Sequence, residues 1–200
     1  TIKLIMRPFR ADLHIHSLLS PCGSLEMSPH EIMVRAKRRG LDMIAVSDHN
    51  STLHCELTVT LGREAGLTVL RAAEVTSAED VHSLVILPDE EATLSFQEWI
   101  DSHCAYMPHN PDIFGDQVVI DRDENIIREI DHFLPAALNA SIDEVESAAH
   151  SHGALFIPAH IDKPSMSILS QLGFIPDDLF IDAVEVIRSV PNLLFPVIRN

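Results

Sequence analysis

Strand and helix patterns alternate along nearly the whole chain, and this alternation limits the fold more than any other sequence feature. Short apolar stretches typical of buried strands are separated by segments with the spacing and capping signals of helices. We predict strands at 11–14, 42–47, 67–72, 82–87, 154–158 and 182–187, and helices at 29–39, 52–65, 88–100, 124–134, 142–152 and 165–172. Such alternation favours parallel β/α units, and therefore an α/β layer or barrel.

Length and charge narrow the class of protein. The 200 residues are enough for one domain with a substantial core, so we treat 1–200 as a single domain. Thirty acidic residues against 14 Lys and Arg give a formal net charge of −16, which disfavours nonspecific binding to long nucleic acid. No apolar run is long enough to span a membrane, and the three scattered cysteines fit a reducing cytoplasm. We expect a cytoplasmic protein with no membrane partner.

Polar side chains lie where the predicted strands end. The set comprises His14 and His16 in DLHIHS, Asp48 and His49 in SDHN, Glu74 in AAEVT, and His160 in PAHID. His82 follows a tight reversal after Glu74, so it can return to the same rim. Because the carboxyl ends of barrel strands converge on one face, we expect these side chains to build one site.

The residue types at these positions favour a metal centre. Imidazoles and a carboxylate are suitable ligands for zinc, manganese or iron, and Glu74 could bridge two metals with its two oxygens. His14 and His16 project to one face because side chains on a strand alternate with period two. Taken singly, His-x-His is a weak signal, Glu74 could be an ion-pair partner and His160 could cap a helix. Packing explains the whole set poorly, since unpaired buried polar groups are costly.

These motifs together resemble those of the PHP (polymerase and histidinol phosphatase) superfamily. DLHIHS, the DHN after a buried strand, AAEVTS followed by a histidine, and PAHIDKP occur in the order that the superfamily shows, from about residue 10 to residue 187. Within it, SPCGSLEMSP, FGDQ and LGFIP are similar to an uncharacterised bacterial subgroup of metal-dependent phosphoesterases. The resemblance implies a distorted (β/α)7 TIM-like barrel with metals at its carboxyl rim.

The resemblance also implies a role for each residue in a site of two or three divalent metals (zinc, manganese or iron). His14 and His16 would bind the first metal, and Glu74 would bridge it to a second metal held by His82 and His160. His49 would serve a third metal. Asp12 and Asp48 would orient ligands. We take Asp48, His49 and Lys163 as the catalytic candidates, with Lys163 as a phosphate contact.

Two positions depart from the pattern of the superfamily. Its other third-metal ligand falls where this chain has Pro21 and Cys22. Cys22 could bind metal as a thiolate, but a buried free cysteine is the favoured interpretation. The superfamily also ends its site with D-x-H after one further strand, whereas this chain ends at Asn200, after an expected strand at 194–198. We therefore expect the sequence to be incomplete at its C-terminus.

The leading functional hypothesis is hydrolysis of a phosphate ester by a hydroxide formed on the metals. The acidic composition favours a small phosphorylated or nucleotide substrate. The alternatives are a non-catalytic structural or regulatory module, favoured by the missing D-x-H, and a metal-dependent amidohydrolase. The sequence leaves the substrate, the metal and the oligomeric state open.

Overall fold

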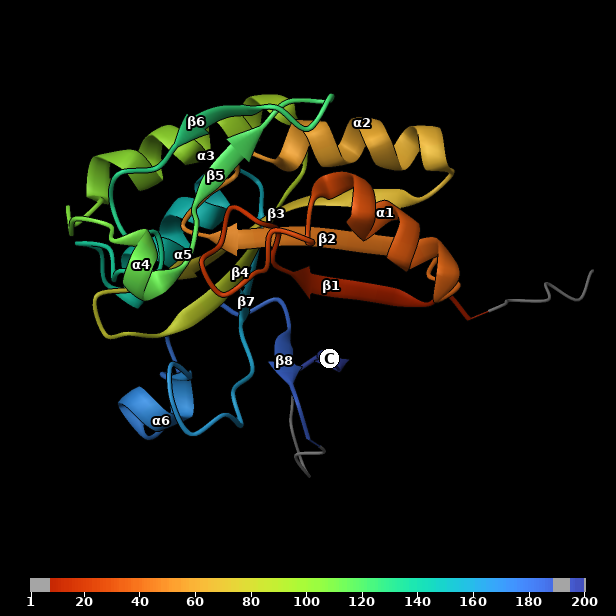
Figure 1. Ribbon diagram of the computed structural model, residues 1–200. Coiled ribbons are helices and arrows are strands. Elements are labelled where there is room, and N and C mark those ends of the chain that lie inside the picture. Colours follow the sequence, from red (N-terminus) through yellow and green to blue (C-terminus); the bar gives the residue numbers. More distant parts are fainter. Residues whose placement is uncertain (1–7, 189–194, 200) are drawn as a thin grey trace, which may run out of the picture.

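One curled sheet forms the centre of the protein, as the computed structural model shows for residues 8–188 and 195–199 (Figure 1). Its strand order is β1-β2-β3-β4-β7. The strands are β1 (Ala11–Ile15), β2 (Met43–His49), β3 (Thr68–Thr76), β4 (His82–Leu87) and β7 (Leu155–Pro158). The first three strands are mutually parallel, so their carboxyl ends reach the same edge.

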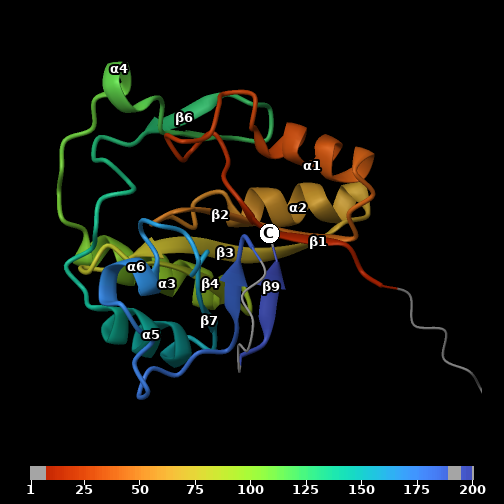
Figure 2. The same ribbon diagram turned by 90° about the horizontal axis from the view of Figure 1, so that it is seen from below.

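Amphipathic helices cover the sheet on two sides (Figure 2). Helices α1 (Pro29–Arg38) and α2 (Cys55–Ala65) pack side chains such as Ile32 and Leu61 against Ile44 and Val46 of β2. Helices α3 (Glu90–His103) and α5 (Ile142–Ser151) pack against β4 and β7. The capping signals of the sequence are present, since Ser28 and Ser141 each accept a hydrogen bond from the third helical residue.

The curl of the sheet continues beyond β7. β8 (Val184–Val186) pairs in parallel with β9 (Val197–Arg199), and the amide of Ile161 donates to the carbonyl of Glu185 in β8. Leu13 of β1 and Ile198 of β9 pack against one inner cluster. The fold is therefore α/β with a half-barrel sheet. Within the described residues no ladder joins β9 to β1, so the full (β/α)7 barrel stays a prediction, and residue 194 of the expected last strand lies outside the described ranges.

The expectation of parallel β/α units does not hold for β4. This strand runs antiparallel to both β3 and β7. A tight turn explains the reversal: the amide of Ser77 donates to the carbonyl of Val81, and Asp80 adopts a φ of 58°. The hairpin brings His82 opposite Thr76, next to the end of β3. The expected return of His82 to the rim is thereby confirmed.

The helix expected at 124–134 is also wrong, because a β-hairpin occupies this region. β5 (Val118–Ile120) pairs with β6 (Ile126–Glu129), and the side chain of Asp121 accepts hydrogen bonds from the turn between them. β-branched residues in both strands favour extended structure over helix. The irregular segment before the hairpin contains α4 (Pro111–Phe114), and α6 (Ile168–Leu172) lies between β7 and β8.

Asn50 fastens the loop after the hairpin to the ends of two strands. Its side-chain amide donates to the carbonyls of Leu134 (2.7 Å) and Ala136 (2.8 Å), and its side-chain oxygen accepts from the amide of Thr76 (2.9 Å). Asn50 is buried and has a φ of 43°, a conformation that asparagine tolerates better than most residues. It therefore fixes the rim on which His49 and Glu74 lie.

We predict that Asn50→Ala lowers the free energy of unfolding by about 2–4 kcal/mol, because it leaves two buried carbonyls and one amide without their partner. Urea unfolding followed by circular dichroism measures the loss. Asn125→Ala, which removes an exposed amide in the hairpin turn, is the control and should cost less than about 1 kcal/mol. Equal losses in the two variants would contradict the role given to Asn50.

Candidate metal centre

Five imidazoles surround the carboxylate of Glu74, whose side chain is 1 % exposed. One oxygen, Oε1, lies near His14 Nε2 (3.2 Å), His82 Nδ1 (2.9 Å) and His160 Nε2 (3.1 Å). The other, Oε2, lies near His16 Nε2 (3.3 Å) and His49 Nδ1 (3.0 Å). The structure therefore brings together all six residues that the sequence predicts as metal ligands.

Strand register explains this convergence. His49, the last residue of β2, pairs with Glu74 of β3 across the parallel ladder, so the two residues lie at one level on neighbouring strands. His14 lies in β1 and His16 directly follows it, two residues apart and on the same face. β7 runs antiparallel to β4 and therefore ends at the same edge as β3, where His160 follows it with a φ of 32°. Residues distant in sequence thus meet because strand ends meet.

The charges at the centre are strongly coupled. Burial alone would raise the pKa of Glu74, but its contacts with the imidazoles, led by His14 and His16, hold this pKa well below its usual range. Burial likewise opposes a charge on His14, but hydrogen bonds to Glu185 and Glu74 outweigh it and raise the pKa of His14 to about 10. Burial lowers the pKa of His49 to about 3, so its ring is neutral near pH 7.

The donor set fits divalent cations. Within the cluster, the buried ring nitrogens His82 Nε2 and His160 Nδ1 have no hydrogen-bond partner among the described residues, and His49 Nδ1 lies 3.0 Å from Glu74 Oε2 without hydrogen-bond geometry. Neutral imidazole nitrogens and a carboxylate at about 3 Å present lone pairs to one another, an arrangement that protons or metal ions must stabilise. Two groups of ligand atoms that include Glu74 lie within 4.8 Å of one another: His14 and His16 form one with it, and His49 and His82 the other.

Glu185 is a functional residue that sequence reasoning missed. It lies in β8 with 0 % exposure, and its two oxygens are each 3.0 Å from His14 Nδ1. One of them also accepts from the backbone amide of His160 (2.8 Å). Contact with His14 lowers the pKa of Glu185 although burial opposes it. The signal in the sequence was an acidic residue between the two valines of a buried strand, where a carboxylate needs a partner.

Asp48 lies behind the ligands and holds them through hydroxyl groups. It accepts hydrogen bonds from Ser17 Oγ (2.6 Å) and Ser20 Oγ (2.7 Å), and Ser20 Oγ lies 3.2 Å from His16 Nδ1. Its position thus suits the orienting role that the resemblance implied. Asp12 contributes a weaker contact, since its side chain accepts from the amide of His14 at 3.4 Å.

The metal ligands line a pocket of about 360 Å³ that also includes Lys163 and Cys22. Lys163 therefore lies beside the predicted ligands, and its contact with phosphate stays a prediction. The interpretation of Cys22 as a buried cysteine is wrong, because the residue is exposed in the loop after β1. Its thiol nevertheless faces the pocket, where partial burial and the charges of Glu74 and Asp48 raise the pKa of Cys22 to about 11.

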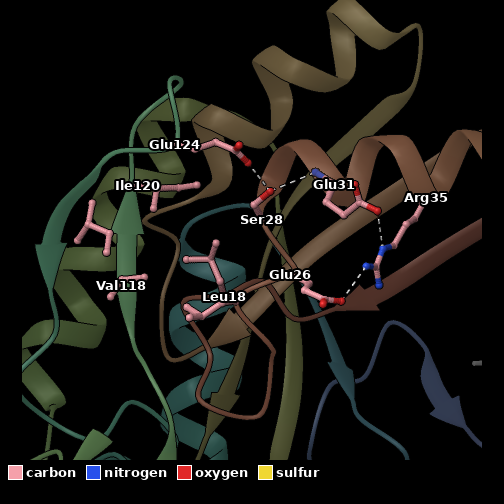
Figure 3. A pocket seen from close by; sticks show the side chains of 10 residues that line it. Leu18, Glu26, Ser28, Glu31, Arg35, Val118, Ile120 and Glu124 are labelled. Carbon is pink, nitrogen blue, oxygen red and sulfur yellow. Dashed lines mark hydrogen bonds and ion pairs between the residues drawn. The ribbon is translucent and has the colours of Figure 1, made fainter.

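A larger hollow of about 560 Å³ lies between α1 and the β5–β6 hairpin (Figure 3). Its charged groups are already engaged with one another: Ser28 donates to Glu124, and Arg35 pairs with Glu26 and Glu31. Because none of its lining residues is a histidine, the hollow offers far less to a metal than the pocket around Glu74. The candidate site is therefore chosen by the metal-binding chemistry of its residues and not by the size of the hollow.

No protein-family model matches the chain. An uncharacterised curated protein of Methanocaldococcus jannaschii is 31% identical over 102 residues, 46% of this chain and 59% of that protein. The lesion-specific endonuclease PfuEndoQ of Pyrococcus furiosus superposes with a TM-score of 0.67 at 22% identity, over 92% of this chain and 43% of that one. Endonuclease Q bound to a 27-mer duplex with an abasic lesion is 26% identical (TM-score 0.60), over 88% of this chain and 42% of that one.

A candidate metal-dependent phosphoesterase of Bifidobacterium adolescentis is 17% identical (TM-score 0.60), over 90% of this chain and 77% of that one. These likenesses agree with the ordered motifs and with the cluster of histidines around Glu74. The motifs of the chain resemble those of the PHP superfamily, and its fold is similar to that of these solved structures. The chain spans less than half the length of the endonuclease chains and 59% of the curated relative. The assignment to a bacterial subgroup of the superfamily stays a prediction.

The comparisons contradict the expectation of a small phosphorylated substrate and no nonspecific long nucleic acid. Endonuclease Q, which has this fold, is seen with duplex DNA at its active site. Net charge is a poor guide because it averages over the whole surface, whereas a phosphate responds to the field at one site, and Lys163 lines the pocket around Glu74. Among the described residues, no helix has the length and apolar character needed to cross a membrane.

We predict that Glu185→Gln weakens metal binding by about 10–100-fold, because the residue that orients His14 loses its charge. Isothermal titration of chelator-stripped protein with Zn²⁺ or Mn²⁺ measures the affinity, and elemental analysis of the loaded wild type should give at least two equivalents per chain. Glu129→Gln, a change on the exposed strand β6, serves as the control. Unchanged affinity in Glu185→Gln would show that His14 needs no such support.

Proposed function

We propose that this protein is a metal-dependent phosphoesterase that cleaves phosphodiester bonds in nucleic acid. The observation that carries the proposal is the carboxylate of Glu74 under five imidazoles, in a pocket that also contains Lys163. The 26% identity with endonuclease Q supports nucleic acid as the substrate class. Both the reaction and the substrate are inferences from ligand chemistry and from this likeness.

The contacts of Glu74 suggest how the ligands divide between cations. His14, His82 and His160 share the side of Oε1, and His16 and His49 share the side of Oε2. Two divalent cations bound there would lower the pKa of a water molecule and neutralise charge on the phosphoryl group. A Ser or Cys nucleophile is then unnecessary.

The residues around the cations have distinct proposed tasks. Lys163 binds a phosphate oxygen of the substrate, since it lines the pocket beside the ligands. His49, whose lowered pKa keeps its ring neutral near pH 7, would offer a lone pair to a cation. Asp48 is a positioning residue, because it acts on His16 through Ser20 and touches no ligand ring itself. Together these tasks account for the three catalytic candidates of the sequence.

We predict that Glu74→Gln lowers turnover of a phosphodiester by at least about 100-fold while the protein stays folded, because glutamine cannot bridge two cations. Wild type and variant are loaded with Mn²⁺ and assayed on duplex and single-stranded oligonucleotides, intact or with an abasic site, and on a chromogenic phosphodiester. Glu64→Gln, an exposed partner of Arg122, is the matched control and should keep full turnover.

The same assay separates the alternatives. A panel of phosphate monoesters and amides is run beside the diesters. Hydrolysis of amides alone would replace the proposal by an amidohydrolase. Metal-loaded wild type without turnover on any substrate would support the non-catalytic module instead.

We further predict that Lys163→Ala raises the KM for an oligonucleotide by about tenfold or more with a smaller change in kcat, since a charged contact to phosphate is lost. Steady-state kinetics at constant salt measures the two parameters. Lys37→Ala, which removes an ammonium on α1 bonded to the carbonyl of Ala65, controls for overall charge. The same rise in KM for both variants would deny Lys163 a specific role.

A further inference from the structure

Cys22 completes a third group of metal-ligand atoms beside the two that contain Glu74. The ligand atoms of His16, Cys22 and His49 all lie within 4.8 Å of one another. The same three residues line one pocket, and Cys22 is exposed enough to be reached from solvent. Cys22 therefore faces two imidazoles of the candidate metal centre.

The loop that carries Cys22 is held in place by its own backbone. The amide of Ser20 donates to the carbonyl of Ser17, and the amide of Gly23 donates to the carbonyl of Ser20, so two turns follow one another. A Cβ atom at Gly23 would lie 2.3 Å from the carbonyl oxygen of Ser17, so the loop closes only with glycine there. The thiol is therefore presented to the pocket by a preformed loop.

The long segment before the β5–β6 hairpin supports this loop from outside. A Cβ atom at Gly115 would lie 2.9 Å from the carbonyl oxygen of Pro21, and Gly115 has a φ of 92°. The backbone of the segment thus approaches the residue next to Cys22 at a point where only glycine fits well. Gly23 and Gly115, which lie in different segments, therefore allow the close backbone contacts that hold the loop of Cys22.

The two imidazoles are arranged to bind the same metal ion as the sulfur of Cys22. The rings of His16 and His49 stack with centroids 4.5 Å apart and planes 25° from parallel. His16 is oriented by Ser20 through Nδ1, and His49 has a backbone amide that donates to the same hydroxyl (3.1 Å). Ser20 of the loop therefore contacts the ring of His16 and the backbone of His49, beside Cys22.

We propose that Cys22, as a thiolate, is an additional ligand of the cation held by His16 and His49, and that this position favours zinc or cobalt over manganese and magnesium. The inference rests on the proposed metal centre and specifies one of its positions. Two imidazoles and a thiolate form a softer ligand set than imidazoles with carboxylates, and thiolates select zinc-like metals. The thiolate would also add a negative charge to the pocket, in which Glu74 is the lining carboxylate.

Cobalt is the probe, because a cobalt–thiolate bond gives a charge-transfer absorption in the near ultraviolet that nitrogen and oxygen ligands do not give. Chelator-stripped protein is titrated with Co²⁺ in a phosphine reductant that contains no thiol, and bound cobalt is counted by elemental analysis. We expect the absorption in wild type. In Cys22→Ser we expect its loss together with about one equivalent of bound cobalt.

Two further variants make the result specific. Cys104→Ser changes a partly exposed cysteine at the end of α3 and should keep both the absorption and the stoichiometry. Cys22→Asp should restore the lost equivalent without the absorption, because a carboxylate is also a ligand but a harder one. Circular dichroism confirms that each variant is folded.

Absence of the charge-transfer absorption in cobalt-loaded wild type, or its persistence in Cys22→Ser, would overturn the proposal. These outcomes leave the proposed function untouched, since the centre around Glu74 and the phosphodiesterase assay do not require Cys22. Conversely, the absorption can be present in a protein that hydrolyses nothing, so the two proposals fail separately.

Discussion

The burial of Glu74 beneath five histidines is the interaction on which the rest of the site depends. A carboxylate with 1 % exposure is stable only if positive charge lies close to it, and here the imidazoles of four flanking segments supply hydrogen bonds to both oxygens or hold cations against them. Removal of any one of these histidines leaves a buried polar atom of the centre without its partner. The centre therefore acts as a unit, with Glu74 as its common member.

The fold builds the centre by bringing several strand ends to one edge of the sheet. The parallel strands β1, β2 and β3 deliver four of the ligands directly. The hairpin to β4 returns His82 to the same edge, and the bend after β7 adds His160. The curl of the sheet then brings Glu185 of β8 behind His14. Packing by the helices keeps these ends in register, and polar contacts such as those of Asn50 lock the loops.

Much of this arrangement could be predicted from the sequence, and the reasons differ from residue to residue. His14, His16 and His49 were accessible because each directly ends a strand with a strong apolar pattern. Glu185 was missed because it is hidden within a strand, where an acidic residue carries no motif and only its three-dimensional partner reveals its task. The helix predicted at 124–134 is instead strand β6 and the loop after it, because the β-branched residues of β6 favour extended structure and pair with β5.

The exposure of Cys22 and the substrate class could not be derived from local pattern at all. Cys22 depends on how the loop after β1 closes around Gly23, which is a matter of tertiary contacts. The substrate depends on the field inside one pocket, which the net charge of the whole chain does not describe.

The most direct test is a crystal structure of the protein loaded with manganese or zinc, with anomalous scattering measured at the metal edge. At least two peaks should lie about 2.0–2.3 Å from the oxygens of Glu74, with the imidazoles now turned to the metals. A metal-loaded crystal in which Glu74 still contacts only imidazoles, with every peak elsewhere, would contradict the metal centre.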